Sequence, residues 1–378
     1  MSSLRANLFL VALGLSLLGL VMVYSAVGTD FLLERLAHMV LGVAVFFVIS
    51  RIRYTAWRRY APAMYLVVLV GLVLVLIPGV GSQINGARRW LDLGPLTVQP
   101  AELAKLAAVL ILSCAVARLP SGSGLPFKPL AMVGALFALV LIEPDFGTSV
   151  IVLSGVAGVL WASEIKTRDL IVSGLVGLVA VAGMMMLEPY RRERFLTFLN
   201  PWSATDGSGY QVVQSMVAIK AGGFFGSGAG SGGQGPYVPE IGTDMIFALI
   251  GEELGLIGMV AVIAAFGFVA FAGLRIALGA PSVMARCVAA GLTTMLTVQA
   301  IFNIGAAMVV LPLAGMTLPF VSYGGTSVLV CFAAVGILYR ISEDSERARE
   351  IKPRANKNNP DSRRRDGGAR HPRAVRGG

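Results

Sequence analysis

Residues Val238–Gly258 read VPEIGTDMIFALIGEELGLIG, a polar loop that continues directly into an apolar helix. The segment carries four carboxylates, on Glu240, Asp244, Glu252 and Glu253. A carboxylate at the edge of a bilayer or inside it is expensive to keep, so each of these is a candidate for function. Acidic residues just before a helix also serve as N-terminal caps that interact favourably with the helix dipole. Asp244 directly precedes the apolar run and fits either role.

Gly251 and Gly255 surround the last two of these acids. Their spacing is the small-xxx-small pattern of helices that pack closely together inside membranes. A helix face of this kind lies against other helices and not against lipid. We therefore expect Glu252 and Glu253 to point toward protein.

The whole chain has the composition of a membrane protein. Of its 378 residues, 56% are hydrophobic and 14% are charged, against about 25% charged residues in an average soluble domain. Its mean hydropathy is +0.76. Apolar runs that can cross about 30 Å of hydrocarbon recur along the sequence, which predicts an all-α, polytopic membrane protein with ten transmembrane helices. The predicted spans are Leu8–Val27, Leu33–Ser50, Ala61–Ile77, Ala101–Ala117, Pro129–Ile142, Gly147–Ser163, Leu170–Leu187, Met245–Leu274, Met284–Leu311 and Leu318–Tyr339.

Positive charge in the loops predicts how these helices are oriented. Four arginines and no acid lie between residues 51 and 59, and further Lys and Arg residues fall in every second loop after that. Cytoplasmic loops carry such an excess, so we expect both termini to be cytoplasmic. The same alternation places residues 78–100 on the exterior, together with a large loop between helices 7 and 8, residues 188–243.

The sequence divides into a membrane domain, residues 1–340, and a basic C-terminal tail, residues 341–378. The tail is rich in Arg, Asn, Gly and Pro and has no apolar period. This composition is typical of disordered segments, so we expect a disordered cytoplasmic tail. Loops and tail account for most of the net charge of +10, and the charge therefore does not indicate a nucleic-acid partner.

Arg88, Arg89 and Trp90 lie together in the first exterior loop. Positive charge on this side runs against the bias that sets the topology, so it needs another cause. Arg and Lys side chains are the usual ligands of phosphate groups, which makes a bound anion one explanation. Lipid headgroups at the interface are the other. Trp90 suits both, because tryptophan is enriched at membrane interfaces.

Glu102 and Lys105 begin the fourth predicted helix and lie on one of its faces, three residues apart. The pair either neutralises itself or presents the ammonium group to a phosphate while the carboxylate holds it in place. An exposed helical pair stabilises a protein by only about 0.2–0.5 kcal/mol. We therefore expect loss of the pair to affect folding little and, if the lysine acts on a phosphate, to affect activity strongly.

Cysteine, histidine and glycine patterns exclude several kinds of site. The three cysteines lie in separate apolar runs without metal-ligand spacing, which favours small buried hydrophobic side chains. The two histidines, His38 and His371, are too far apart in the sequence to suggest a metal site or a triad. Gly228, Gly230 and Gly233 match the G-x-G-x-x-G pattern of dinucleotide binding, but no strand precedes them, so no organic cofactor is predicted. They favour a mobile loop that approaches another backbone closely.

Eight short motifs follow one another along the chain. They are NGARRW (Asn85–Trp90), QPAELAK (Gln99–Lys105), EPDFGT (Glu143–Thr148), FLNPW (Phe198–Trp202), GYQVVQS (Gly209–Ser215), PEIGTD (Pro239–Asp244), IGEELGLIG (Ile250–Gly258) and LPFVSYGGTS (Leu318–Ser327). Together and in this order they resemble the SEDS family, the shape, elongation, division and sporulation proteins of bacteria. The resemblance extends from about the first predicted helix to Arg340, and eight motifs in register make it specific.

The resemblance implies a ten-helix peptidoglycan glycosyltransferase that polymerises lipid II on the outer face of the bacterial cytoplasmic membrane. Its substrates would be lipid II and the growing glycan on undecaprenyl pyrophosphate. Its partners would be a class B penicillin-binding protein, which is a transpeptidase, and other proteins of the division or elongation complex. PGVG at Pro78–Gly81 and GMTLPFVSYGG at Gly315–Gly325 resemble the division members more than the elongation members, which implies a location at the division septum.

The resemblance also implies roles for particular residues. Asp244 matches the family's catalytic aspartate and would deprotonate the acceptor sugar hydroxyl or hold a divalent cation, Mg²⁺ or Mn²⁺. A single displacement with inversion at the anomeric carbon would form the β-1,4 link, so no enzyme nucleophile is required. The residues expected to bind substrate, the cations through its pyrophosphate, are Arg88, Arg89, Trp90, Glu102 and Lys105.

Two positions depart from the family pattern. Gly242 stands where the family usually has histidine, and Ala101 stands where it usually has serine. The missing histidine argues against a mechanism that needs an imidazole beside Asp244. The alternative functions are a lipid II flippase, which is a transporter, and a division scaffold without activity. The sequence shows no inverted repeat typical of transporters, and a scaffold would leave Asp244 without a role.

Overall fold

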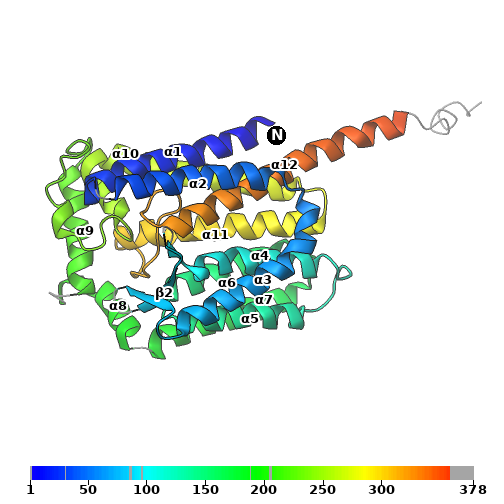
Figure 1. The fold of residues 1–378 in the computed structure, drawn as a ribbon, viewed down its shortest axis with the longest axis horizontal. Coiled ribbons are helices and arrows are strands. Elements are labelled where there is room, and N and C mark those ends of the chain that lie inside the picture. Colours follow the sequence, from blue (N-terminus) through cyan, green and yellow to red (C-terminus); the bar gives the residue numbers. More distant parts are fainter. Residues whose placement is uncertain are drawn as a thin grey trace, which may run out of the picture.

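The computed structural model describes residues 2–357 apart from residues 30, 85–86, 95–96, 188 and 204–206. In this part of the chain, helices run lengthwise through one elongated bundle (Figure 1). The helices are α1 Ser2–Val27, α2 Leu32–Arg51, α3 Trp57–Leu76, α4 Pro100–Val116, α5 Phe127–Ile142, α6 Phe146–Ala162, α7 Thr167–Leu187, α8 Pro189–Leu199, α9 Ser208–Gly222, α10 Ile246–Leu278, α11 Val283–Ala307 and α12 Gly325–Lys357. Short 3-10 helices cover Tyr54–Ala56, Pro201–Ser203 and Gly235–Tyr237.

Seven helices among the described residues are long and apolar enough to cross a membrane. They are α1, α2, α7, α10, α11, α12 and the segment Tyr54–Leu76, which contains α3. Three further helices are shorter: α4 and α6 have 17 residues and α5 has 16. Each predicted span overlaps one of these helices. The prediction of a polytopic helical membrane protein is therefore confirmed.

A small antiparallel sheet lies between α3 and α4, so the chain is not all-α as predicted. Its strands are β1 Gly81–Ile84, β2 Ala87–Asp92 and β3 Thr97–Val98, in the order β1–β2–β3. Gly81 pairs with Leu91, and Leu91 pairs with Val98. The ladder satisfies backbone groups that would otherwise need water or side-chain partners. The sequence signal for this hairpin is the Asn-Gly dipeptide at residues 85–86, which a search for apolar runs does not register.

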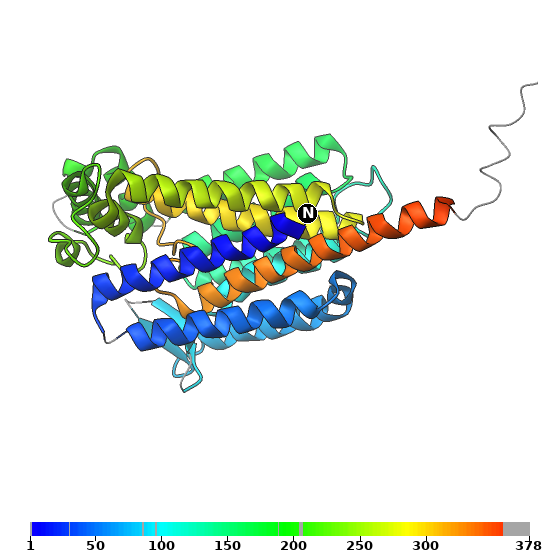
Figure 2. The same cartoon turned by 90° about the horizontal axis from the view of Figure 1, so that it is seen from above.

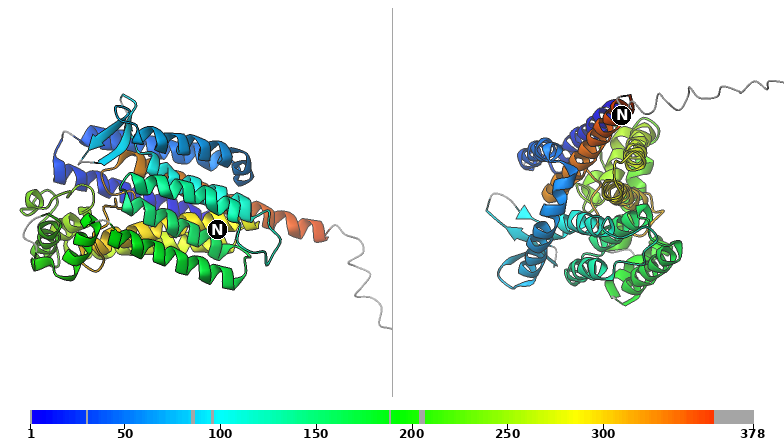
Figure 3. Two further views of the ribbon diagram at one scale, coloured as in Figure 1. Left: turned by 90° about the horizontal axis from the view of Figure 1, so that it is seen from below. Right: turned by 90° about the vertical axis from the view of Figure 1, so that its right-hand side faces the viewer.

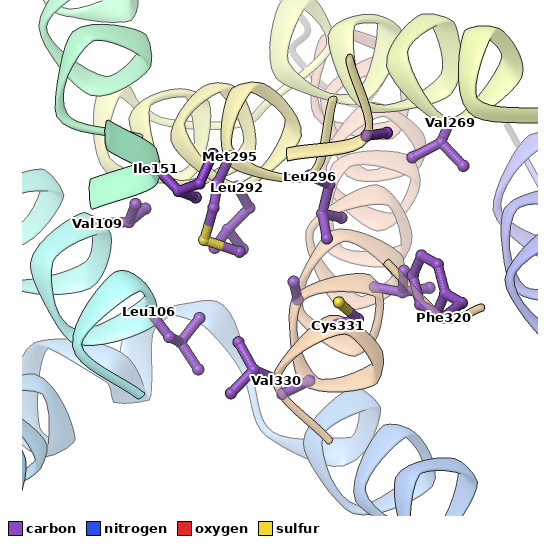
Figure 4. Packing of buried hydrophobic residues seen from close by; sticks show 14 of the residues in the cluster. Leu106, Val109, Ile151, Val269, Leu292, Met295, Leu296, Phe320, Val330 and Cys331 are labelled. Carbon is purple, nitrogen blue, oxygen red and sulfur yellow. The ribbon is translucent and has the colours of Figure 1, made fainter. Parts of the chain in front are cut away.

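α4 lies at the centre of the bundle. It packs against α3, α5, α6, α11 and α12, and nearly all of its side chains are buried. Small residues permit this close packing: a Cβ on Gly155 of α6 would lie 2.9 Å from Cγ2 of Val109 of α4. Figure 4 shows Val109, Ile151 and Met295, which come from α4, α6 and α11, converging in this core.

α12 differs from the predicted last span at both ends. Residues Leu318–Gly324 precede the helix as an irregular segment, in which Phe320 has a positive φ of 67°. At its other end the helix continues to Lys357 and projects beyond the bundle (Figure 2). The predicted disorder from Ile341 onward is therefore wrong for the part of the tail that α12 covers. Residues 358–378, the rest of the predicted tail, lie outside the described residues.

Ion pairs explain why α12 extends beyond its apolar part. Arg340 pairs with Glu343 at 3.1 Å and with Asp344 at 3.0 Å, one turn later on the same helix. Pairs at this spacing stabilise an isolated helix by about 0.2–0.5 kcal/mol each. Arg5 of α1 also pairs with Glu346 of α12, at 2.8 Å. This last contact places the beginning of α1 and the far part of α12 at the same end of the bundle.

Candidate active site

Asp244 lies in the turn that leads into α10. The start of α10 is at the end of the bundle where α8, α9 and the strands gather (Figure 3). Its side chain is half-buried. Met245 occupies the N-cap position of α10, and no side chain caps the helix there. Asp244 therefore forms no capping hydrogen bond with α10, and its catalytic role stays a prediction.

Two side chains hold the backbone of this turn in place. Asn303 of α11 donates hydrogen bonds from Nδ2 to the carbonyl of Asp244, at 2.9 Å, and to the carbonyl of Met316, at 2.6 Å. Ser322 donates from Oγ to the carbonyl of Thr243, at 2.6 Å. Met316 and Ser322 belong to the segment between α11 and α12, which we call the α11–α12 loop. This loop and α11 together position Asp244.

Arg194 of α8 and Asp244 both lie near Gly315 of the α11–α12 loop. A Cβ on Gly315 would lie 3.5 Å from Nη1 of Arg194 and 3.6 Å from Oδ2 of Asp244, which is ordinary van der Waals contact. Gly315 has a φ of +69°, a conformation that glycine adopts without the penalty of other residues. Glycine is thus favoured here by its backbone conformation.

Helix α2 holds the α11–α12 loop from another side. Arg35 is completely buried and donates from Nη2 to the carbonyl of Phe320, and to that of Val321 at 3.3 Å. Tyr323 donates from its hydroxyl to a carboxylate oxygen of Glu34, at 2.5 Å. The hydrogen bonds from Arg35 satisfy backbone carbonyls of the α11–α12 loop where Phe320 has its positive φ.

The segment between α5 and α6, the α5–α6 loop, brings a second aspartate into this region. Asp145 caps α6 by accepting hydrogen bonds from the amide of Thr148 at 3.0 Å and from its hydroxyl at 2.9 Å. It also accepts one from Nε2 of Gln99, at 2.9 Å. Asp145 is therefore engaged by the protein itself, whereas Asp244 accepts no hydrogen bond on its carboxylate from the described residues.

Arg89 of β2 attaches the sheet to the α5–α6 loop. Its Nε donates to the carbonyl of Glu143 at 3.1 Å, and its Nη2 donates to the carbonyl of Pro144 at 2.8 Å. The carboxyl group of Glu143 is 0% exposed, and neither of its oxygens has a hydrogen-bond partner among the described residues. Arg89 thus has a structural role and keeps only part of its guanidinium group for a ligand.

Burial changes the acid strength of both unsatisfied carboxyl groups. It raises the pKa of Asp244 to about 6, with Arg194 lowering the pKa and Glu240 and Asp145 raising it. Burial and the neighbouring Asp145 raise the pKa of Glu143 to about 8, against the opposing charge of Arg89. At neutral pH, Asp244 is therefore mostly ionised and more basic than an exposed aspartate. Glu143 mostly keeps its proton.

Glu102 and Lys105 form the predicted pair, but the pair is not exposed. Their side chains are 7% and 2% exposed, and Nζ lies 2.7 Å from Oε2. The expectation of an exposed pair is wrong because α4 is surrounded by other helices. Lys105 also donates to Oε1 of Gln299 at 2.9 Å, and Gln299 donates to the carbonyl of Thr317 at 2.9 Å. Through Gln299, the pair therefore helps to hold the α11–α12 loop in place.

Arg88 and Trp90 flank Arg89 on β2 and are partly buried. Opposite them on β1, Gln83 is the register partner of Arg88, and Ser82 is the register partner of Trp90. The register shifts by one residue between these pairs, which leaves Arg89 as an extra residue of β2. This irregularity lies where Arg89 binds the α5–α6 loop.

No group of three or more His, Cys, Asp or Glu side chains among the described residues could hold a metal ion. At the candidate site, Asp244 is the predicted ligand. Asp145 is bound to Thr148 and Gln99. Asp244 therefore stays the predicted protein ligand at this position.

Several residues of the site were not assigned from the sequence. Arg194 lies in the predicted exterior loop, residues 188–243, and Asn303 and Gln299 lie in an apolar span without a local signal. Glu143 and Asp145 belong to the EPDFGT motif, which carried the resemblance but no role. In the structure, Asn303 binds the backbone of Asp244, and the charges of Arg194 and Asp145 act on its carboxylate.

Residues 5–347 match the family model described as cell cycle protein, which covers FtsW, RodA and SpoVE. The chain belongs to this FtsW/RodA/SpoVE family. One relative in the family, the stage V sporulation protein E of Bacillus subtilis, is 36% identical over 353 residues, which cover 89% of this chain and 96% of that protein. Another, the probable peptidoglycan glycosyltransferase FtsW of Coxiella burnetii, is 37% identical over 357 residues, which cover 88% and 95%.

Solved structures of the FtsW/RodA/SpoVE fold resemble this chain over most of its length. A chain from a peptidoglycan synthase complex that coordinates polymerization and crosslinking is 32% identical, with a TM-score of 0.76 over 90% of this chain and 97% of that one. The rod shape determining protein RodA of Thermus thermophilus is 28% identical, with a TM-score of 0.68 over 89% and 96%. The resemblance predicted from the eight motifs is confirmed.

Proposed function

We propose that the chain is a peptidoglycan glycosyltransferase that polymerises lipid II into β-1,4-linked glycan strands for septal cell-wall synthesis. The observation that carries this proposal is the half-buried carboxylate of Asp244, held beside Arg194 with its pKa raised to about 6. Relatives named probable peptidoglycan glycosyltransferase FtsW, at 36% and 37% identity, support it.

In the reaction, Asp244 accepts the proton of the acceptor sugar hydroxyl. The hydroxyl oxygen then forms a bond to the anomeric carbon of the donor, and the bond from that carbon to undecaprenyl pyrophosphate breaks with inversion. A base works best when its pKa lies near the ambient pH, and burial moves the pKa of Asp244 in that direction. Arg194 opposes the shift and so keeps the carboxylate ionised and ready to accept the proton.

The leaving pyrophosphate needs positive charge, which we assign to Arg88 and Arg194, with Trp90 beside Arg88. Arg89 contributes what remains of its guanidinium group after it binds the α5–α6 loop. Lys105 is 2% exposed and already bonded to Glu102 and Gln299, so it acts by positioning the α11–α12 loop. A preorganised donor that meets developing negative charge typically contributes about 2.7–4 kcal/mol to catalysis.

A divalent cation, Mg²⁺ or Mn²⁺, fits this site with Asp244 as its protein ligand and with pyrophosphate oxygens and water as the others. Mg²⁺ is commonly bound in this way, by one or two carboxylates together with substrate phosphates. When bound, it would neutralise charge on the leaving group. The displacement involves no redox or carbanion chemistry, and so we propose no organic cofactor.

Membrane topology follows from the same proposal. Ten helices cross the cytoplasmic membrane, both termini are cytoplasmic, and the sheet with α8 and α9 faces the exterior. The Arg5–Glu346 ion pair, which joins α1 to α12 at one end of the bundle, supports termini on one side. The partners are lipid II, a class B penicillin-binding protein and other division proteins. The likeness to a chain of a peptidoglycan synthase complex supports a transpeptidase partner.

Thiol labelling tests this topology. Leu93→Cys replaces a side chain that is 65% exposed beside the sheet, and an impermeant reagent should label it from outside intact cells. Thr55→Cys, at the opposite end of the bundle, should react only after permeabilisation. Cys114, Cys287 and Cys331 are all buried, so the background should be low. Labelling in the reverse pattern would contradict the exterior location of the site.

Reconstitution with lipid II tests the activity. The purified full chain, with and without its class B partner, should convert lipid II into glycan strands that separate on a gel. Asp244→Asn should lower the rate by about 10²–10⁴-fold, the range for loss of a general base. Asp92→Asn, which changes an exposed acid of β2, is the control and should retain the rate. Transbilayer movement of lipid II without polymer would mean a flippase, and neither activity would mean a scaffold.

A further inference from the structure

α10 is interrupted two turns after its start. Gly255 has φ 63° and ψ −161°, so the helix breaks there, and the carbonyls of Glu252 and Glu253 lose their normal partners in the next turn. The glycine-rich loop, residues 223–234, supplies replacements. The amide of Ser227 donates to the carbonyl of Glu252 at 2.9 Å, and the amide of Gly228 donates to the carbonyl of Glu253 at 3.0 Å. These two hydrogen bonds hold the glycine-rich loop against the break in α10.

The side chains of Glu252 and Glu253 lie beneath this loop, 2% and 1% exposed, and the predicted orientation toward protein is confirmed. The amide of Gln234 donates to Oε1 of Glu252 at 2.7 Å, and the hydroxyl of Ser25 in α1 donates to Oε1 of Glu253. Oε2 of each carboxylate has no hydrogen-bond partner among the described residues. No Lys or Arg of the described chain forms an ion pair with either group.

The two carboxylates converge on one point, at Gly232 of the loop. A Cβ on Gly232 would lie 3.2 Å from Oε2 of Glu252 and 3.2 Å from Oε1 of Glu253. Consecutive residues of a helix normally point about 100° apart, yet the side chains of Glu252 and Glu253 both reach Gly232. Two like charges brought together away from water repel each other unless a positive charge lies between them.

We propose that Glu252 and Glu253 form a binding site for a divalent cation with hard, oxygen-preferring character, Ca²⁺ or Mg²⁺. Its ligands would be the carboxylate oxygens that face Gly232, with water completing the coordination, as these ions accept. The cation would hold the glycine-rich loop against the break in α10 and, through Ser25, against α1. The site is separate from Asp244, which precedes α10, and the inference does not depend on the proposed activity.

Thermal unfolding of the full-length purified protein tests this site. After treatment with EDTA, addition of CaCl₂ or MgCl₂ should raise the unfolding temperature of the wild type, and the shift should saturate. With two carboxylates, we expect an affinity in the range of extracellular calcium sites, about 10⁻⁴–10⁻³ M. Glu253→Gln should unfold in EDTA at the temperature of the wild type or above it, because a like charge is removed, and should not respond to the cation.

Gly232→Ala supplies a steric test with a matched control. The added methyl group would occupy the point on which the carboxylates converge, so the cation response should be lost. Gly233→Ala, where a Cβ meets nothing within 4 Å, should respond like the wild type. Asp244→Asn should also keep the response, which separates this site from the proposed active site. The proposal is overturned if neither cation shifts wild-type unfolding, or if Glu253→Gln and Gly232→Ala respond as the wild type does.

Discussion

Arg194 and Asp244 direct their polar atoms at the same position of a third residue, Gly315, whose Cβ would lie 3.5 Å from Nη1 of Arg194 and 3.6 Å from Oδ2 of Asp244. Arg194 belongs to α8 and Asp244 to the turn before α10. The segment that contains α8 therefore folds back to bring a cation near the carboxylate. This arrangement sets the charge state of Asp244, and its consequences can be measured.

The pH dependence of polymerisation should report the ionisation of Asp244. A carboxylate base is active when ionised, so activity should rise with pH through about 6, the raised pKa of Asp244. Arg194 lowers this pKa and Glu240 raises it. Arg194→Gln should therefore move the rising limb of the pH–activity curve to higher pH, and Glu240→Gln should move it to lower pH.

The measurement is the initial rate of lipid II polymerisation between pH 5 and 9. Asp92→Asn, an exposed acid of β2, is the control for a general change of surface charge and should leave the limb in place. If both Arg194→Gln and Glu240→Gln shifted the limb in the same direction, Asp244 would not be the group that titrates.

Gly315→Ala should inactivate the protein without unfolding it. The methyl group would lie in van der Waals contact with Nη1 of Arg194 and Oδ2 of Asp244, where it would take space from the substrate groups that these side chains face. Misplacement of reacting groups by about 1 Å can lower a rate by about 10²-fold. Gly79→Ala is the matched control, because Gly79 also has a positive φ, of 88°, but its Cβ would meet nothing within 4 Å. Both variants should lose similar amounts of thermal stability, and only Gly315→Ala should lose polymerisation. Equal activities of the two variants would contradict the arrangement.

Glu143→Gln should make thermal stability less sensitive to pH between 4.5 and about 8. The folded-state pKa of Glu143, about 8, lies above its ordinary value of 4.5. Between these two pH values, the folded protein therefore binds more protons than the unfolded chain. The free energy of unfolding falls as pH rises through this range. At about 1.4 kcal/mol per pKa unit, the loss for a group buried this completely reaches up to about 5 kcal/mol.

Unfolding temperatures of the purified protein at pH 5, 6, 7 and 8 check this. Glu143→Gln should show a flatter profile than the wild type and should be the more stable of the two at pH 8. Glu164→Gln is the control, because Glu164 is an exposed carboxylate whose pKa is lowered by its hydrogen bonds to Ser121 and Arg286. Its profile over this range should match that of the wild type.

Lys105→Met should destabilise the protein, whereas loss of an exposed ion pair would change its stability little. It leaves Glu102 buried without its partner, and breaking a buried ion pair from one side typically costs about 3–5 kcal/mol. The double variant Glu102→Gln/Lys105→Met removes both charges and should recover most of that stability. If the ammonium group positions the α11–α12 loop through Gln299, the double variant should remain deficient in polymerisation per folded molecule.

Thermal unfolding and lipid II polymerisation, measured on the same preparations, separate these effects. Lys105→Arg, which keeps the charge but changes its reach and hydrogen-bond geometry, should retain part of the activity. Full activity of a well-folded double variant would show that the pair is needed for folding alone.

Much of the fold was predictable because its signals are local. Each long apolar run can satisfy its backbone in a membrane only as a helix, and so the helices were apparent from composition and length. The motif around Asp244 was apparent because its residues are adjacent in the sequence. The sheet was missed although Asn85-Gly86 indicates a hairpin, and the extension of α12 was missed because ion pairs around Arg340 support it where the apolar pattern ends.

The sequence by itself thus determined the class of protein, the approximate positions of its long apolar helices and the prediction that Asp244 is catalytic. Only the tertiary structure decided what surrounds that aspartate. It placed Arg194 beside Asp244, buried Lys105 against Gln299, and bound Arg89 to the carbonyl of Glu143. These contacts join residues far apart in the chain, and they depend on which helix faces meet. Hydrophobic periodicity says that a face is buried, but packing alone determines its neighbours.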